Sequence, residues 1–459
     1  MPAAFADPDA LTRPVHMLMP DALGPWLASQ TPDVASWLTA SGFDAALGDV
    51  RLLPGPGGVV GAAIGLGTPQ SRARVRFGMV KGIATLPAGD WHLSGDLPAV
   101  LRDETAVGWL LSAYRFDRYR KTGPLAARLK APENCDAPRL RAMADGEFLT
   151  RDLINTPASD MGPADLEHAA LTLAKIQGAT ASVITGDDLL THNFPMIHAV
   201  GRASTRAPRL IDLRWGSSGP AVTLVGKGVC FDTGGLNIKP SSGMQLMKKD
   251  MGGAATVLGL AQMIMALKLP LRLRVLIPAV ENSISGNALR PKDILTSRKG
   301  LTVEVNDTDA EGRLVLADAL AYACEEQPDT IISMATLTGA ARVAVGPDLA
   351  PYYTDDAILA AALESGATTG FDPVWRMPFH TPYEPVIEPG IADLDNAPGF
   401  GFAGSVTAAL FLRRFVTTPR YLHFDIYGHS PADHPARPKG GAGQGARAIL
   451  NGLPQMLGL

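Results

Sequence analysis

Apolar residues recur in short, regularly spaced runs along the first part of the chain. Their alternation predicts strands near residues 50–53, 59–64 and 90–93, and spacings of three and four predict helices near 33–39 and 99–119. The segment Lys121–Pro138 contains three prolines and a glycine and is expected to be a linker. We therefore predict a small N-terminal α/β domain that covers residues 1–145 and includes the linker.

The remainder of the chain alternates apolar strands with helices. The stretch RDLINTP, Arg151–Pro157, is expected to end a helix, because a residue before proline avoids the α region. A helix is predicted over 164–176, and strands are predicted near 182–184, 210–214, 221–225, 273–277, 330–334 and 421–426. Strands separated by helices are typical of a sheet covered on both faces. Residues 146–459 are thus expected to form a larger C-terminal α/β domain, with a mixed central sheet covered by helices on both faces.

Composition narrows the class of protein. Hydrophobic residues make up 46% and charged residues 19% of the 459 positions, as in a well-packed globular protein. A net charge of −4 without a basic tract argues against nucleic acid as a partner. The N-terminal residues lack a secretory signal, and no apolar run reaches the roughly eighteen residues that span a bilayer. Three widely separated cysteines, without a CxxC pair, favour the cytoplasm.

Charged side chains follow the apolar run Ala221–Val225. The glycine-rich stretch after this run contains Lys227, Asp232, Lys239 and Asp250. We expect these four residues to lie on a loop at the end of a strand, and a helix to begin at Gly252.

A second charged stretch, Asp307–Leu314, reads DTDAEGRL. It places Asp309, Glu311 and Arg313 at alternate positions. In an extended chain this spacing points all three side chains to one face, just ahead of a helix whose apolar residues begin at Leu314. The two stretches together are expected to bring four carboxylates into one site.

Four buried carboxylates without cations would repel one another until some were protonated. Two divalent cations would balance the charges of Asp232, Asp250, Asp309 and Glu311 if Lys227 bound as a neutral amine. A cation pair can share a bridging water, lower its pKa and polarise a carbonyl, which suits hydrolysis. The nearby Lys227, Lys239 and Arg313 argue against a simple calcium-binding turn, since an oxygen cage gains nothing from basic groups.

These residues resemble the cytosolic leucine aminopeptidases. Residues Thr308–Leu314 match the family signature NTDAEGRL, and the stretch GKG…FD.GG…IKP…MK.DMGGAA matches upstream. The resemblance implies that Lys227, Asp232, Asp250 and Glu311 hold one metal and that Asp232, Asp309 and Glu311 hold the other. It implies that Lys239 stabilises an oxyanion and that Arg313 holds a bicarbonate acting as general base. It assigns the pocket for the substrate's first side chain to Met247, Thr336, Leu337 and Gly339.

Further properties follow from the same resemblance. It implies an aminopeptidase that removes leucine or another apolar residue from the N-terminus of peptides, with two metal ions per subunit and a homohexameric assembly. Carboxylates with one amine accept Zn²⁺ or Mn²⁺, and Mg²⁺ or Co²⁺ at an exchangeable position. Asp307 departs from the family, which has asparagine there, so a charge replaces an amide beside the metals. Tighter metal binding, a shifted pH dependence and a different hold on the substrate amine are the alternative consequences. Cys230 is interpreted as a small buried hydrophobe.

Other interpretations of the sequence are weaker or remain open. Gly399–Gly404 satisfies GxGxxG without a preceding strand, and Pro431 after Ser430 lacks the N–H that a nucleophile elbow needs. His423, His429 and His434 do not have the spacing of a zinc site. A dipeptidase for cysteinylglycine and a DNA-binding regulator that retains the fold remain alternatives.

Overall fold

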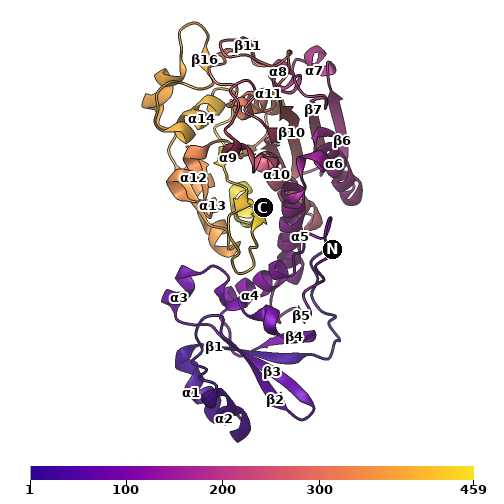
Figure 1. Cartoon of the computed structure of the whole chain (residues 1–459), viewed down its shortest axis with the longest axis vertical. Coiled ribbons are helices and arrows are strands. Elements are labelled where there is room, and N and C mark those ends of the chain that lie inside the picture. Colours follow the sequence, from indigo (N-terminus) through magenta and orange to yellow (C-terminus); the bar gives the residue numbers. More distant parts are fainter. Residues whose placement is uncertain (1) are drawn as a thin grey trace. The chain divides into compact units, whose positions relative to one another are not determined.

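The computed structural model describes residues 2–459 and divides them into two compact units (Figure 1). One unit holds the described residues up to Phe148 together with Ala432–Lys439, and the other holds Leu149–Pro431 and Gly440–Leu459. The division falls within helix α5, Ala137–Asn155, which also contains the boundary predicted at residue 145. The segment Ala432–Lys439 carried no sequence signal that would separate it from its neighbours.

The N-terminal unit is built on a five-stranded sheet with the order β2-β3-β1-β4-β5. The strands are β1 (Arg13–Leu18), β2 (Val50–Gly55), β3 (Gly58–Gly65), β4 (Gly89–Ser94) and β5 (Ala127–Leu129). The helices are α1 (Pro20–Ala28), α2 (Pro32–Ala40), α3 (Pro69–Arg74) and α4 (Ala99–Ser112). The three predicted strands are present as β2, β3 and β4. The sequence patterns missed β1, α1, α3 and β5.

Two predictions for this unit were wrong. Helix α4 ends at Ser112 rather than Tyr119, because the guanidinium of Arg115 donates hydrogen bonds to the carbonyls of Ser112 and Tyr114 at the helix end. The predicted linker contains β5, whose three residues pair in parallel with β4. A strand this short has no readable alternation, so only the neighbouring strand decides that it forms.

The larger unit contains a nine-stranded sheet with the order β15-β14-β17-β13-β8-β10-β7-β6, and β9 also pairs with β10. The strands are β6 (Thr180–Thr185), β7 (Arg209–Trp215), β8 (Ala221–Gly226), β9 (Gly228–Asp232), β10 (Arg272–Asn282), β13 (Thr330–Ala335), β14 (Ala350–Tyr353), β15 (Val374–Met377) and β17 (Tyr421–Asp425). The pairs β8–β10, β8–β13 and β13–β17 are parallel, whereas β7–β10, β6–β7 and β14–β17 are antiparallel. The sheet is therefore mixed, as predicted.

Short strands lie outside this sheet. They are β11 (Ile294–Thr296), β12 (Thr302–Glu304) and β16 (Leu394–Asp395) in a three-stranded sheet, and β18 (His429–Ser430) with β19 (Gly440–Gly441) in a two-stranded one.

Helices cover both faces of the large sheet. One face is covered by α8 (Pro195–Gly201), α11 (Glu311–Glu325) and α14 (Gly404–Arg413), and the other by α6 (Pro163–Gln177), α10 (Gly252–Ala266) and α15 (Ala446–Leu457). The remaining helices are α7 (Asp188–Thr191), α9 (Ser241–Met244), α12 (Gly339–Val345) and α13 (Ala357–Thr369). No helix in the described part of the chain is long and apolar enough to cross a membrane.

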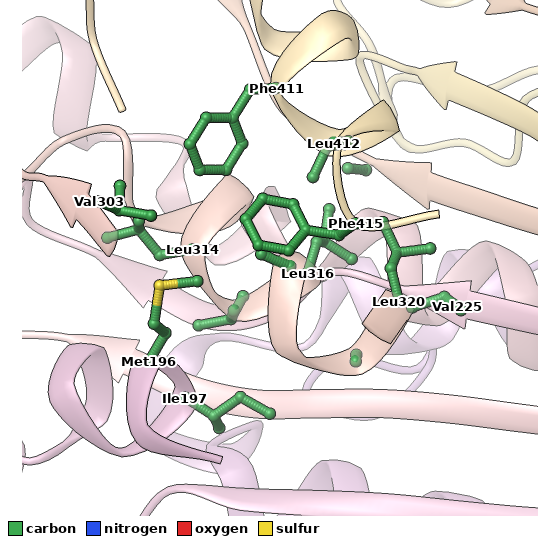
Figure 2. Close-up of a cluster of buried hydrophobic side chains, with 14 of the residues drawn as sticks. Met196, Ile197, Val225, Val303, Leu314, Leu316, Leu320, Phe411, Leu412 and Phe415 are labelled. Carbon is green, nitrogen blue, oxygen red and sulfur yellow. The ribbon is translucent and has the colours of Figure 1, made fainter. Parts of the chain in front are cut away.

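Buried side chains form a hydrophobic core on the α11 side of the sheet (Figure 2). Because both faces of the sheet are covered, its strands appear in the sequence as continuous apolar runs. Val225, Leu276 and Ile331 point into this core, while their buried neighbours on the same strands serve the opposite face. Phe411 and Phe415, on and just after α14, pack there with ring centroids 5.3 Å apart. The core thus fixes α11, and with it the residues at its first turn.

We predict that Phe415→Ala lowers the free energy of unfolding by about 3–5 kcal/mol, because the ring is fully buried and its removal leaves a cavity. Phe402→Ala is the matched control. Its ring is 76% exposed, and we expect a change of less than about 0.5 kcal/mol. Denaturant unfolding of the two variants measures the difference, and equal losses would contradict this account of the core.

Candidate active site

The carboxyl ends of the parallel strands β8, β10, β13 and β17 lie at one edge of the large sheet. A cavity of about 500 Å³ is found in the same unit. It is lined by Lys227, Asp232, Lys239, Pro240, Ser242, Gly243, Leu246, Met247, Lys249, Asp250, Asp309, Thr336, Leu337, Thr338, Gly339, Arg342, Ile426 and Tyr427. Such an edge is where open α/β sheets bind their ligands.

Lys227 lies between β8 and β9, so the predicted single loop contains an additional strand. Its Nζ is 2.7 Å from Asp250 Oδ2 and 3.0 Å from Glu311 Oε1, and it donates a hydrogen bond to the carbonyl of Thr336. Gly312 allows this approach, since a Cβ there would lie 2.6 Å from Lys227 Nζ. The glycine of the EGRL motif therefore makes room for the lysine.

Asp232 is the last residue of β9, and both oxygens of its carboxylate have partners. Its Oδ1 accepts hydrogen bonds from Gly234 N and from Asn282 Nδ2, each at 2.8 Å, and its Oδ2 is 2.8 Å from Lys239 Nζ. Lys239 Nζ also contacts Asp309 Oδ1. The second lysine thus joins the two charged stretches, as the first one does at Asp250 and Glu311.

The predicted extended arrangement of Asp309, Glu311 and Arg313 was wrong, although the residues do gather. Asp309 lies in a turn, and α11 begins at Glu311, so Glu311 and Arg313 belong to the first helical turn. The helix begins earlier than the apolar pattern indicated because an acidic side chain is favourable at a helix N-terminus. Oxygen atoms of Asp232, Asp309 and Glu311 lie within 4.8 Å of one another.

Asp250 joins this group through Lys227. It lies in a turn of 3₁₀ helix, Met247–Met251, and its Oδ1 accepts a hydrogen bond of 2.9 Å from Thr336 Oγ1. The expected four carboxylates therefore share one buried site, in which Lys227 lies between Asp250 and Glu311.

Without any metal ion, two ammonium groups face four carboxylates in this site, so the negative charge is only partly compensated. Burial, together with the carboxylate of Asp232, raises the pKa of Glu311 to about 8 and that of Asp309 to about 7. Burial alone would lower the pKa of Lys227, but Asp250 and Glu311 raise it above its ordinary value. Glu311 Oε2 is buried and accepts no hydrogen bond from any described residue. Carboxylates with raised pKa values and an unpartnered oxygen fit divalent cations.

Three predicted site residues, Asp307, Glu311 and Arg313, do not line the cavity. Arg313 is buried, its Nη1 donates a hydrogen bond of 2.5 Å to the carbonyl of Asn396, and its Nε has no partner among the described residues. Asp307 accepts the N–H of Asp309 at 2.8 Å, so its carboxylate shapes the turn that presents Asp309. An asparagine oxygen could accept the same bond. The predicted Met247, Thr336, Leu337 and Gly339 do line the cavity.

Sequence reasoning missed several buried residues that orient the site. Asp425, the last residue of β17, accepts hydrogen bonds from the N–H groups of Leu337 and Thr338 and from the hydroxyl groups of Thr338 and Ser405. Asn396 bonds both sides of the turn at Asp307, and Asn282 holds Asp232. In the sequence, these residues share one feature, a polar side chain at or just after the end of a strand. The sequence pattern shows this feature but does not indicate which residue the side chain binds.

The remaining sequence interpretations can also be placed. Cys230 is buried, as expected. His423 is buried in β17 beside Ser333, and among the described residues the His, Cys, Asp and Glu group that could hold a metal ion is Asp232, Asp309 and Glu311. Gly399–Gly404 runs from a turn into α14, which begins at Gly404, without a βαβ unit around it.

A doubly covered mixed sheet, with a carboxylate cluster suited to divalent cations beside a cavity at its strand ends, defines a metal-dependent hydrolase. Residues 148–450 match the catalytic domain of the cytosol aminopeptidase family, and residues 13–132 match the N-terminal domain of the M17 aminopeptidases. The chain belongs to this M17 family, and it is a metal-dependent aminopeptidase that cleaves single residues from peptide ends.

Relatives and solved structures agree with this assignment. A "Probable cytosol aminopeptidase" of Methylobacterium radiotolerans is 37% identical over 86% of this chain and 84% of its own. The crystal structure of a cytosol aminopeptidase from Coxiella burnetii shares 43% identity, with a TM-score of 0.91 over 97% of this chain and 98% of its own. The bottromycin maturation enzyme BotP in complex with Mn shares 31% identity, with a TM-score of 0.86 over 97% of this chain and 99% of its own.

We predict that the metal-free protein loses stability as the pH rises from about 5 to about 8. The folded-state pKa values of Glu311 and Asp309 lie above their ordinary values of 4.5 and 3.8. Their protonation therefore stabilises the fold at low pH, and this contribution is lost as the pH rises through the folded values. We expect the free energy of unfolding to fall by roughly 2–4 kcal/mol over this pH range.

Thermal unfolding in chelator at pH 5.5, 7 and 8.5 measures this loss, and saturating Mn²⁺ should remove most of it. Glu311→Gln is the control and should reduce the dependence in chelator to the part contributed by Asp309, because the variant has no carboxyl group to titrate at position 311. A Glu311→Gln variant with the wild-type dependence would contradict the explanation.

Proposed function

We propose that this chain removes the N-terminal residue of peptides with the help of two divalent metal ions. The observation that carries the proposal is the contact of Lys227 with Asp250 and Glu311 and of Lys239 with Asp232 and Asp309. Two amines and four carboxylates from distant parts of the chain meet beside one cavity. A structural cluster would not need so many buried charges.

The proposed metal-holding residues are Lys227, Asp232, Asp250, Asp309 and Glu311. Lys227 would bind as a neutral amine, and loss of its proton would accompany metal binding, because its pKa is raised while no cation competes for it. When bound, the cation pair supplies Lewis acidity for the activation of water and of a carbonyl. Zn²⁺ and Mn²⁺ are the proposed occupants, with Mg²⁺ or Co²⁺ at a more exchangeable position.

The chain's own residues supply the other parts of the chemistry. Lys239 lines the cavity, and its Asp232 and Asp309 contacts raise its pKa above the ordinary value, so it would remain an ammonium that donates a hydrogen bond to a developing oxyanion. Arg313 would hold a bicarbonate as proton acceptor. Its buried Nε without a partner among the described residues supports an anion there.

The remaining parts of the proposal concern the substrate and the assembly. Met247 and Leu337 line the cavity and would favour leucine or another apolar residue at the first position, with Thr336 and Gly339 completing that pocket. Asp307 would act on the substrate amine only through the turn that carries Asp309. We propose a homohexamer in the cytoplasm, with neither a membrane nor nucleic acid as a partner. The net charge of −4 supports the exclusion of nucleic acid.

Selectivity for a free N-terminus can be tested with a blocked substrate. We expect leucine amide to be hydrolysed and N-acetyl-leucine amide to react at least about 10³-fold more slowly, a difference of ~4 kcal/mol. The acetylated nitrogen has no basic lone pair to place against the charged cluster. Equal kcat/KM values for the two amides would reject an exopeptidase.

The role of Lys239 can be separated from metal binding. We predict that Lys239→Ala lowers kcat by about 10²–10³-fold, as expected for the loss of one oxyanion donor, and that the metal content stays unchanged. Lys248→Ala is the matched control. That lysine donates a hydrogen bond to the carbonyl of Asn155, does not line the cavity, and should leave kcat unchanged. A metal-free Lys239→Ala protein would show that Lys239 serves the metals instead.

A further inference from the structure

Lys249 is a buried lysine in the wall of the candidate active-site cavity. It is 7% exposed, and its Nζ makes no hydrogen bond or ion pair with any described residue. Its Nζ lies 5.0 Å from the ring centroid of Tyr427, which also lines the cavity. An ammonium that is mostly withdrawn from water and has no acceptor in the protein is poorly compensated, so a ligand in the cavity that supplies an anionic acceptor would be favoured there.

Arg342 adds a second positive charge to the same part of the wall. Its Cζ lies 5.1 Å from the Tyr427 ring centroid, and its Nη1 is 3.5 Å from the Tyr427 hydroxyl. The side chain is exposed and lines the cavity, and it has no ion pair among the described residues. Two basic groups thus contact one tyrosine at the cavity wall.

The neighbouring carboxylate of Asp250 attracts Lys249 electrostatically, but neither Lys249 nor Arg342 forms an ion pair with a carboxylate of the metal centre among the described residues. Lys227 is paired with Asp250 and Glu311, and Lys239 is paired with Asp232 and Asp309. In the metal-loaded protein, two divalent cations would balance the four carboxylates without Lys249 or Arg342. Lys249 and Arg342 form a basic wall that remains available to a ligand.

The basic wall lies next to the residues proposed to contact the first side chain of the substrate. Lys249 follows Met247 by two positions in the same 3₁₀ turn. Arg342 belongs to α12, whose first residue is Gly339, and Leu337 lies just before that helix. The apolar residues would contact the stem of a side chain, and the basic wall would contact a charged group at its end.

We propose that Lys249, assisted by Arg342, recognises a carboxylate on the first residue of the substrate. The inference rests on the proposed aminopeptidase function and adds a substrate class to it. Glutamate combines a short apolar stem with a terminal carboxylate, so it should be cleaved from an N-terminus better than glutamine, its neutral isostere. Leucine remains a substrate because it uses the apolar part of the same pocket.

Three amides with the metal-loaded full chain test the proposal. We expect kcat/KM for glutamic acid α-amide to exceed that for glutamine amide by about ten-fold, as for one hydrogen bond to a charged group. In Lys249→Met this ratio should fall to about one, and in Arg342→Met it should fall by a smaller factor. Lys249→Arg keeps the charge and should keep a ratio above one, which excludes misfolding as the cause.

Lys248→Met is the matched control, because the neighbouring lysine is bonded to Asn155 outside the cavity, and it should show the wild-type ratio. A wild-type enzyme that cleaves glutamine amide as fast as glutamic acid α-amide overturns the proposal. Leucine amide distinguishes failure of this inference from failure of the proposed aminopeptidase function. If the protein cleaves none of the three amides, the aminopeptidase function itself is refuted.

A second pair of substrates identifies the source of the carboxylate. Alanylglycine and its amide differ only in the C-terminal carboxylate. If Lys249→Met changes the ratio for this pair and leaves the glutamate ratio unchanged, the basic wall binds the free C-terminus of a dipeptide, and the assignment to the first side chain is overturned.

Discussion

Charge compensation among buried groups is the constraint on which this site depends. Carboxylates from four separate positions share one site, and burial raises the pKa of Asp250, Asp309 and Glu311 there above the ordinary values. Lys227 and Lys239 each contact two of them. A divalent cation would take over the same task with two charges, which explains how one arrangement serves both metal-free folding and metal-dependent hydrolysis.

The scaffold places these charges by ending its strands at one edge. Lys227 follows β8, Asp232 ends β9, Thr336 follows β13 and Asp425 ends β17. The hydrogen bonds of Asp425 to Leu337 and Thr338 fix the loop that lines the cavity, and Asn282 fixes Asp232. Groups that never touch the substrate therefore decide how accurately the carboxylates and lysines are presented.

The basic residues of the cavity fall into two sets with different partners. Lys227 and Lys239 are paired with carboxylates, whereas Lys249 and Arg342 lie against Tyr427 without a carboxylate partner. The first set belongs to the proposed metal-binding and oxyanion-stabilising chemistry. The second set gives this chain a means of selecting among substrates, because an unpaired charge next to a binding pocket discriminates by the charge of what enters.

The sequence alone determined the α/β class, the two-domain organisation and most strands of the large sheet, because buried strands and their intervening helices leave long periodic patterns. It also identified the charged stretches, since a lysine or aspartate after an apolar strand is conspicuous. Only the tertiary structure decided that Lys249 lies unpaired in the cavity wall, that Asp307 shapes a turn outside the cavity, and that Ala432–Lys439 belongs to the N-terminal unit. Each of these depends on contacts between residues far apart in the chain, and periodicity carries no information about such partners.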